Sequence, residues 1–492
     1  VAGGPCACNP EPLADFVDVF SLGEGEEATV ELTELYRKHK RKGFCKADFL
    51  REAAQIEGHY VPSLYDVTYN EDGTVHAVTP KDGAPAKVRK RIMLDMDKSF
   101  YPDKFVVPFT EIVHDRAVSE IFRGCIRGCR FCQAGYIYRP VREKSPDVIN
   151  RQSHDLCASS GYEEFSLSSL STSDYTKLEE LLPELLEWAE KEHTNISLPS
   201  LRVDGFSEEL ANRLNVLRRS GLTFAPEAGT QRLRDAINKN LSEDEILRTA
   251  TKAFAGGWTA VKLYFMMGLP TETLDDIAGI AELGQKIVNL YYQNPNRPRG
   301  KGVNVSISAS CFVPKPFTPF QWEPQDTMEQ LREKQQHLVK SVTTKKISLS
   351  WHDAQTSFLE AVLARGDRRL GAVLLEACFA RGDRKMADVL EAAWRLGCRF
   401  DGWTDQFSFE NWMKAFEQCG VDPAFYANRT RSFDEVFPWD HLDYGITKEF
   451  LIRENKKAHE SVTTPNCRQK CAGCGASCWK GGVCVEKREN SL

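Results

Sequence analysis

The chain has 492 residues, enough for about three domains of ordinary size, and this length excludes a single small module. Its 64 Lys and Arg against 70 Asp and Glu give a formal net charge of −6, which argues against a strongly basic nucleic-acid binder. With 41% hydrophobic and 27% charged residues, no apolar run of about 18 residues and no signal-peptide pattern, the sequence predicts a soluble, cytoplasmic protein that has no membrane partner.

The first part of the chain, residues 1–40, begins at Val1 without a methionine, and we expect it to be the end of a domain whose main body lies upstream. A short helix is predicted over residues 11–20, a strand over 19–22 and a helix over 27–40, where the apolar residues follow a helical period. Residues 41–110 predict a linker region with short strands, because β-forming residues alternate with turn dipeptides there.

Residues 111–351 are predicted to be one α/β domain, since β-forming runs alternate with helical ones. The strands are expected at residues 117–122, 165–168, 196–203, 222–225, 260–267 and 303–312, with a further one at 347–351. Parallel strands need a covering helix between them, so this series predicts a parallel sheet in a curved or barrel-like arrangement. Ser242 and Glu245 fit a capping box at one of these helices, which Gly256 would end.

Residues 352–445 are predicted to form a helical extension, and residues 446–492 a Cys-rich tail. The extension contains a short repeat, at residues 364–369 and 380–385. The repeat has two interpretations. Gly366 and Gly382 can mark two helix boundaries, or the arginines can bind an anionic ligand; these arginines are Arg365, Arg368, Arg381 and Arg384.

Sixteen cysteines are the outlier of the composition. A secreted disulfide framework spreads its cysteines evenly, whereas metal sites bring them together at short spacings. Two groups are closely spaced here, namely Cys125, Cys129 and Cys132 in the α/β domain, and Cys467, Cys471, Cys474, Cys478 and Cys484 in the tail. The pattern therefore favours metal centres over a disulfide scaffold.

The first group lies in a loop that directly follows a predicted strand. Three thiolates can each bind one iron of a 4Fe-4S cube and leave the fourth iron open to a small molecule. A structural zinc site needs four closed ligands, and the next candidates along the chain are only His154 and Cys157. The sequence thus predicts a 4Fe-4S cluster on Cys125, Cys129 and Cys132 rather than a zinc knuckle.

Cys-x3-Cys-x2-Cys, with the aromatic Phe131 directly before the third cysteine, resembles the motif of the radical S-adenosylmethionine (SAM) enzymes. The resemblance implies a partial (β/α)6 barrel similar to a TIM barrel, and a cluster whose open iron binds SAM. One electron from the reduced cluster would cleave SAM to a 5'-deoxyadenosyl radical, which takes hydrogen from a substrate. A low-potential donor such as flavodoxin or ferredoxin would supply that electron.

The resemblance also implies SAM-binding residues at the carboxyl ends of the strands. These residues are Phe131 in the cysteine loop, Ser168, Ser169 and Ser171 after the second strand, Arg202 after the third, Glu227 after the fourth, and Gly268 and Pro270 after the fifth. The serines replace a typical Gly-Gly-Glu and can equally form an ordinary turn. Glu227 can equally be a first-turn acid of a helix, and Arg202 a solvated residue at a strand end.

The start of the chain, up to about residue 27, resembles the end of the Rossmann-like cobalamin-binding domain found in one branch of these enzymes. The loop at residues 312–320 resembles the same branch and the methylthiotransferases. The Asp-x-His-x-x-Gly segment that would ligate cobalt is absent from the sequence. We therefore expect the intact protein to have a cobalamin domain, and this chain alone to bind cobalamin weakly or not at all.

Within that branch, the nearest resemblance is to an uncharacterised group with a Cys-rich tail. The reaction therefore stays open among methyl transfer, sulfur insertion and rearrangement of an unknown substrate. An alternative function is that of a non-catalytic metal-binding protein associated with RNA or the ribosome, and RNA or ribosomal components are also possible substrates.

The tail repeats the spacing of the first group in Cys467, Cys471 and Cys474, followed by Cys478. Gly473 replaces the aromatic residue, and no predicted strand leads into the motif. A second metal site is predicted on these four cysteines, with Cys484 as a fifth candidate. Zinc, an auxiliary 4Fe-4S cluster and a tail without metal all stay open.

Overall fold

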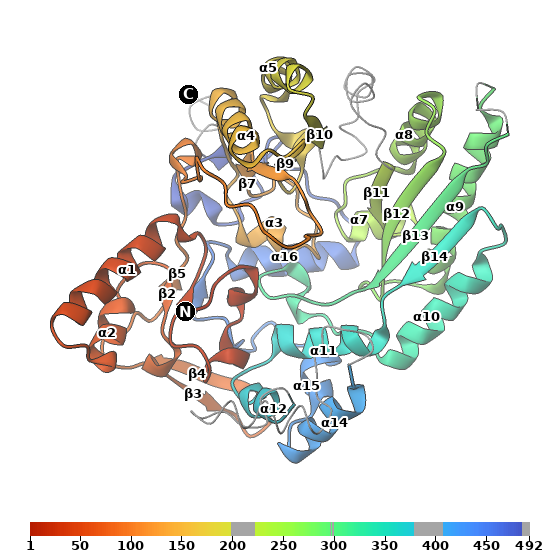
Figure 1. Ribbon diagram of the computed structural model, residues 1–492. Helices are drawn as coiled ribbons and strands as arrows, with labels where there is room; N and C mark the ends of the chain where they lie inside the picture. Colours follow the sequence, from red (N-terminus) through yellow and green to blue (C-terminus); the bar gives the residue numbers. More distant parts are fainter. Residues whose placement is uncertain (198–221, 296, 298–299, 378–406, 485–492) are drawn as a thin grey trace. The chain divides into compact units, whose positions relative to one another are not determined.

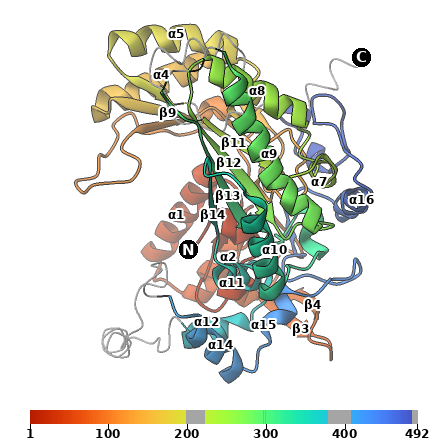
Figure 2. The same ribbon diagram turned by 90° about the vertical axis from the view of Figure 1, so that its right-hand side faces the viewer.

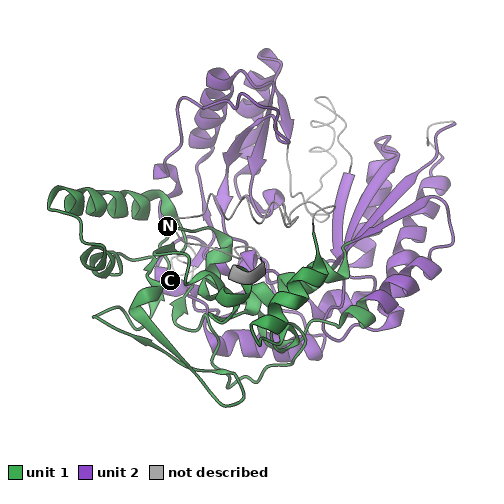
Figure 3. Cartoon of the chain, turned by 60° about the horizontal axis from the view of Figure 1, so that its bottom comes forward, with its two compact units in different colours: residues 1–92, 311–331, 352–444 green, residues 93–310, 332–351, 445–492 purple. Residues whose placement is uncertain are grey.

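The computed structural model describes residues 1–197, 222–295, 297, 300–377 and 407–484. The chain divides into two compact units (Figure 3). Unit 1 comprises residues 1–92, 311–331 and 352–444, and unit 2 comprises residues 93–310, 332–351 and 445–492. In the part of the chain that is described, no helix combines the length and the apolar character needed to cross a membrane.

Unit 2 contains the predicted series of strands. A three-stranded sheet has the order β10-β9-β6, and a four-stranded sheet has the order β11-β12-β13-β14. The strands are β6 (Ala117–Glu120), β9 (Glu164–Ser168), β10 (Asn195–Ser197), β11 (Leu222–Glu227), β12 (Ala260–Met267), β13 (Asn304–Cys311) and β14 (Ile347–Trp351). The pairings β6–β9, β9–β10, β11–β12 and β13–β14 are parallel.

The predicted parallel α/β arrangement is thereby confirmed, and strands that follow one another in the chain are neighbours in both sheets. The second half of the third predicted strand, residues 198–203, lies outside the described residues. Residues 198–221 also connect β10 to β11. The closing of the two sheets into a partial barrel therefore stays a prediction.

Helices follow the strands as expected. They are α4 (Pro146–Ser160), α5 (Leu178–Lys191), α8 (Glu243–Ala255), α9 (Leu274–Gln293) and α10 (Met328–Ser341). The predicted capping box is present at α8: the Ser242 side chain accepts from the Glu245 backbone N–H, and the Glu245 carboxylate accepts from the Ser242 backbone N–H. Gly256 ends this helix, as predicted.

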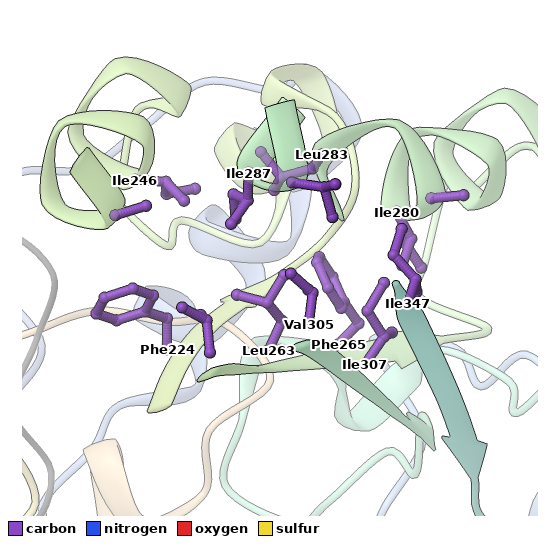
Figure 4. Close-up of a cluster of buried hydrophobic side chains, with 14 of the residues drawn as sticks. Phe224, Ile246, Leu263, Phe265, Ile280, Leu283, Ile287, Val305, Ile307 and Ile347 are labelled. Carbon is purple, nitrogen blue, oxygen red and sulfur yellow. The ribbon is translucent and has the colours of Figure 1, made fainter. Parts of the chain in front are cut away.

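The four-stranded sheet and its helices share one hydrophobic core. Figures 1 and 2 show α8 and α9 lying along one face of β11 to β14. Figure 4 shows side chains of the strands and of these helices pointing toward one another, among them Phe224, Leu263, Val305, Leu283 and Ile287. Burying one such side chain stabilises a fold by about 1.5–3 kcal/mol, so this core fixes the strand ends that follow it.

Unit 1 is mainly helical in its C-terminal part. Its elements include β1 (Phe20–Ser21), α1 (Gly25–Arg41), α2 (Lys46–Ala53), β2 (His59–Tyr60), the hairpin of β3 (Tyr65–Tyr69) and β4 (Val75–Pro80), β5 (Val88–Arg89), α11 (Ala354–Arg365), α12 (Leu370–Ala377), α14 (Phe409–Gln418), α15 (Pro423–Ala427) and β15 (Leu442–Asp443). The predicted strand over 19–22 and helix over 27–40 are confirmed by β1 and α1.

The helix predicted over residues 11–20 is wrong. Only a 3-10 turn, η2 (Glu11–Leu13), forms there. Such a short segment does not hold an α-helix by itself, and its conformation is set by a buried contact: the Glu11 carboxylate accepts from the Arg368 guanidinium at 2.6 Å and from the Tyr60 hydroxyl. Packing in unit 1 therefore overrides the local helical pattern.

The arginines in the first copy of the repeat make hydrogen bonds within unit 1. Arg365 ends α11 and donates to the carbonyl oxygens of Glu323 and Ala427, both at 2.7 Å. Arg368 contacts Glu11, as described above. Gly366 stands between α11 and α12, so the helix-boundary interpretation is confirmed for this copy. Arg381 and Arg384 of the second copy lie outside the described residues.

Candidate functional site

The cysteine loop of unit 2 leaves the three-stranded sheet at its carboxyl edge. In the pairing of β6 with β9, Glu120 is opposite Ser168, so the two strands end at the same level. β7 (Phe122–Arg123) leads into residues 124–133, and α3 (Ala134–Ile137) follows. The loop packs closely: a Cβ on Gly128 would lie 2.9 Å from the Asn238 amide nitrogen, which donates to the Gly128 carbonyl oxygen at 3.0 Å.

The three cysteines of this loop are partly buried and interact with one another. The pKa of Cys125 is raised to about 11 and that of Cys132 to about 12, in both cases first by burial and then by the neighbouring Cys129. Throughout the described residues, no three His, Cys, Asp or Glu side chains are arranged to hold a single metal ion. Three neighbouring cysteines supply the soft sulfur donors that three irons of a 4Fe-4S cube require.

An ion pair ties the cysteine loop to the turn after β9. Arg127 Nε donates to Asp174 Oδ2 at 2.9 Å, and the Ser171 hydroxyl donates to the same oxygen at 2.7 Å. Asp174 belongs to the turn η5 (Thr172–Asp174). Sequence reasoning missed Asp174, because its partner Arg127 lies 47 positions away and no local pattern connects them.

The predicted serines lie at the end of β9, next to the cysteine loop. Ser168 is the last residue of the strand, the Ser169 hydroxyl bonds that of Thr172 at 2.9 Å, and Ser171 is buried against Asp174. The hydroxyls of Ser169 and Ser171 therefore hold the η5 turn. Phe131 is partly buried beside Cys132.

Glu227 ends β11 in a left-handed backbone conformation, with φ of 69°. The register of β11 on β12 shifts between Phe224 and Glu227, and such an irregularity re-aims a side chain at the end of a strand. The carboxylate pairs with Lys239 Nζ at 3.1 Å. Lys239 also acts electrostatically on Cys132, so the end of β11 and the cysteine loop come together.

Gly268 and Pro270 form the tight turn that follows β12. Gly268 has φ of 84°, and its backbone N–H donates to the carboxylate of Glu272 at 2.6 Å. Glu272 is buried and pairs with Lys334 at 2.9 Å. The turn thus stands at the carboxyl end of the strand next to β11. Arg202, with Asp204, lies outside the described residues.

Arg130 fastens the cysteine loop to two distant segments. Its backbone N–H donates to the Ile237 carbonyl at 2.9 Å, and its guanidinium donates to the carbonyls of Ala236 at 2.8 Å and Val462 at 2.7 Å. It also pairs with Glu454 of α16 (Lys448–His459) at 3.1 Å, with both side chains fully or almost fully buried. The only signal in the sequence was an arginine in a polar loop, since Glu454 lies 324 positions away.

A cavity of about 210 Å³ lies between this loop and the tail. Four tail cysteines line it, namely Cys467, Cys471, Cys474 and Cys484. The pKa of Cys484 is raised to about 11, first by burial and then by Cys474, Cys467 and Cys471, so the four thiols lie near one another. Cys478 is exposed and is not part of the lining, whereas sequence reasoning placed it fourth in this set.

Comparisons with known proteins agree with this geometry. Residues 1–62 match the family described as "Radical SAM proteins, N-terminal", and residues 119–284 match "Radical SAM superfamily". The uncharacterized protein MJ0966 of Methanocaldococcus jannaschii is 29% identical over 376 residues, which cover 76% of this chain and 72% of that protein.

Two solved structures are similar in part. The radical SAM methyltransferase TsrM from Kitasatospora setae, solved with cobalamin and a 4Fe-4S cluster, has 14% identity and a TM-score of 0.44, over 66% of this chain and 59% of that one. Coproporphyrinogen III oxidase HemN from Escherichia coli, a radical SAM enzyme, has 16% identity and a TM-score of 0.33, over 46% and 53%. The chain thus spans less than two thirds of either.

The superfamily match contains the three loop cysteines, the strands β9 to β12, and the ends of β11 and β12 at Glu227 and Gly268. The match and the arrangement of the loop thus concern the same segment of unit 2. On this evidence residues 119–284 form a radical SAM domain.

Proposed function

We propose that this protein cleaves SAM reductively and uses the resulting 5'-deoxyadenosyl radical to take a hydrogen atom from its substrate. The observation that carries the proposal is the set of three interacting thiols, Cys125, Cys129 and Cys132, in a loop at the carboxyl edge of a parallel sheet. Membership of the superfamily implies a 4Fe-4S cluster and SAM. When bound, the cluster supplies the electron that breaks a carbon–sulfur bond of SAM.

The chain's own residues would hold and orient these groups. The Arg127–Asp174 pair and the contacts of Arg130 fix the loop on both sides, which keeps the three sulfurs in place. Glu227 would accept a hydrogen bond from the ribose or the amino group of SAM, because it stands at the end of β11 beside Lys239 and Cys132. Gly268 and Pro270 would approach the adenine through the backbone of their turn.

Replacing Glu227 tests its role. Glu227→Gln and Glu227→Gly should both raise the KM for SAM by about 10- to 100-fold, because a hydrogen bond to a charged group contributes about 1.5–3 kcal/mol. Glu227→Gly keeps the left-handed backbone at no steric cost, so any fall in its Tm reports the lost pair with Lys239 and not backbone strain. Glu187→Gln, on an exposed pair with Lys191, is the control. If the KM for SAM were unchanged in Glu227→Gly, the Glu227 side chain would have no role in binding SAM.

A low-potential donor of the flavodoxin or ferredoxin class would deliver the electron, and we propose methyl transfer, sulfur insertion or rearrangement as the outcome. Cobalamin binding supplies no step in this proposal. The match of residues 1–62 to a family of radical SAM N-terminal segments supports placing the chain among enzymes with a domain before the core.

The proposal is tested by anaerobic reconstitution with iron and sulfide, followed by reduction in the presence of SAM. We expect 5'-deoxyadenosine and methionine, and none without reductant. Turnover in extracts of cells grown in deuterated medium should transfer deuterium to 5'-deoxyadenosine and so identify fractions that contain the substrate. A fully loaded, reduced protein that forms no 5'-deoxyadenosine in any such fraction would overturn the proposal.

A further inference from the structure

The tail of unit 2 brings four cysteines to one cavity. Cys467, Cys471, Cys474 and Cys484 line it together with mostly apolar residues, among them Ile126, Phe450, Pro465 and Val483. Its other polar side chains are those of Arg139, Glu454, Thr464 and Ser477. The four thiols are therefore the one kind of metal ligand that recurs around the cavity.

Backbone contacts hold the tail on the core of unit 2 at several points. The N–H of Cys467 donates to the Ile126 carbonyl, directly after Cys125 in the sequence, and the N–H of Val483 donates to the Val141 carbonyl, both at 3.0 Å. Gly482 has φ of 60°, and a Cβ there would lie 1.9 Å from the Val141 oxygen, so only glycine permits this approach. Cys467 and Cys484, near the two ends of the motif, are thus fixed by the fold.

The arrangement of the thiols distinguishes between a zinc ion and a cluster. Tetrahedral zinc draws four sulfurs to about 2.3 Å from one point, which leaves them within about 4 Å of one another. Cys467, Cys471, Cys474 and Cys484 instead line a cavity of about 210 Å³, which one ion held at that distance would not fill. An iron–sulfur cube on four cysteines occupies such a space.

A buried guanidinium lies against the four thiols. Arg139 hydrogen-bonds the Cys474 sulfur and interacts electrostatically with Cys467, and it also donates to the Arg127 carbonyl at 2.8 Å. An iron–sulfur cube on four thiolates is an anion, and a buried charge needs a partner. Arg139 supplies that partner, which an uncharged cavity would not need.

We propose that Cys467, Cys471, Cys474 and Cys484 bind a second 4Fe-4S cluster, closed by four protein ligands and adjacent to the loop of the first. Each cysteine gives its thiol proton to solvent and forms one iron–sulfur bond, and no iron is left open for SAM. Cys484 takes the fourth place that the spacing of the sequence assigned to Cys478. This inference concerns a separate set of ligands and stands without the proposed reaction.

Metal analysis of the anaerobically reconstituted full chain tests the inference. The wild type should hold about eight iron and eight sulfide per chain, and the triple variant Cys125→Ala/Cys129→Ala/Cys132→Ala about four of each. Cys474→Ala and Cys484→Ala should each lower the wild-type content to about four, and Cys478→Ala should leave it unchanged. In the triple variant, the EPR signal of the reduced cluster should not respond to SAM.

Other outcomes overturn the inference without touching the proposed reaction. If the wild type held one zinc and about four iron per chain, the tail would bind zinc and not a second cluster. A loss of iron in Cys478→Ala but not in Cys484→Ala would return the fourth place to Cys478. An iron-free triple variant with a native circular dichroism spectrum would remove the site. Conversely, eight iron without cleavage of SAM would refute the proposed reaction and leave the second cluster in place.

Discussion

Cys129→Ala is expected to abolish the reductive cleavage of SAM. Cys129 interacts with both Cys125 and Cys132, which makes it one of the three ligands that the loop brings together. Without it, one iron of the cube loses its protein ligand, and two remaining thiolates do not hold the cube. We expect 5'-deoxyadenosine to fall to the level of the reaction without reductant, and iron to fall by about four per chain.

The control is Cys157→Ala. Cys157 is buried in the core formed by α4, β6 and β9, and it belongs to neither cysteine group. Its truncation should cost the fold about 1–2 kcal/mol and leave cleavage and iron content unchanged. Cleavage of SAM by Cys129→Ala at the wild-type rate, with wild-type iron, would contradict the assignment of the three ligands.

Much of the fold could be predicted from the sequence because its signals are local. In β12 and β13 buried residues alternate with exposed or partly exposed ones, so a period of two marks both strands within a few residues of sequence. The capping box at Ser242 is likewise contained within four residues. The helix predicted over residues 11–20 was wrong because the conformation of this segment depends on Arg368, which is distant in the chain.

In the candidate site, too, local features could be predicted and long-range contacts could not. The three cysteines lie within eight positions of one another, so their spacing alone suggested an iron–sulfur loop. The residues that hold the loop, Asp174 and Glu454, come from remote elements and meet it only after packing. In the tail, spacing favoured Cys478, but the 3-10 turn η8 (Ala476–Trp479) leaves that side chain exposed, whereas Cys484 returns to the cavity.

Arg130→Met is expected to give the largest loss of stability of any substitution in the loop. Arg130 is 0% exposed and Glu454 2%, and the guanidinium also satisfies the carbonyls of Ala236 and Val462. Removing one partner of a buried ion pair costs about 3–5 kcal/mol when the other charge is left alone. Glu454 keeps Lys457 at 3.0 Å and the Thr464 hydroxyl, so we expect a loss near the lower end of this range. Urea unfolding followed by circular dichroism should show this decrease, together with loss of iron on gel filtration.

The size of the effect separates a buried pair from an exposed one. Arg37→Met removes an exposed pair with Glu34 and should change the free energy of unfolding by less than about 1 kcal/mol. A loss below about 1 kcal/mol in Arg130→Met would show that this contact does not fasten the cysteine loop to α16.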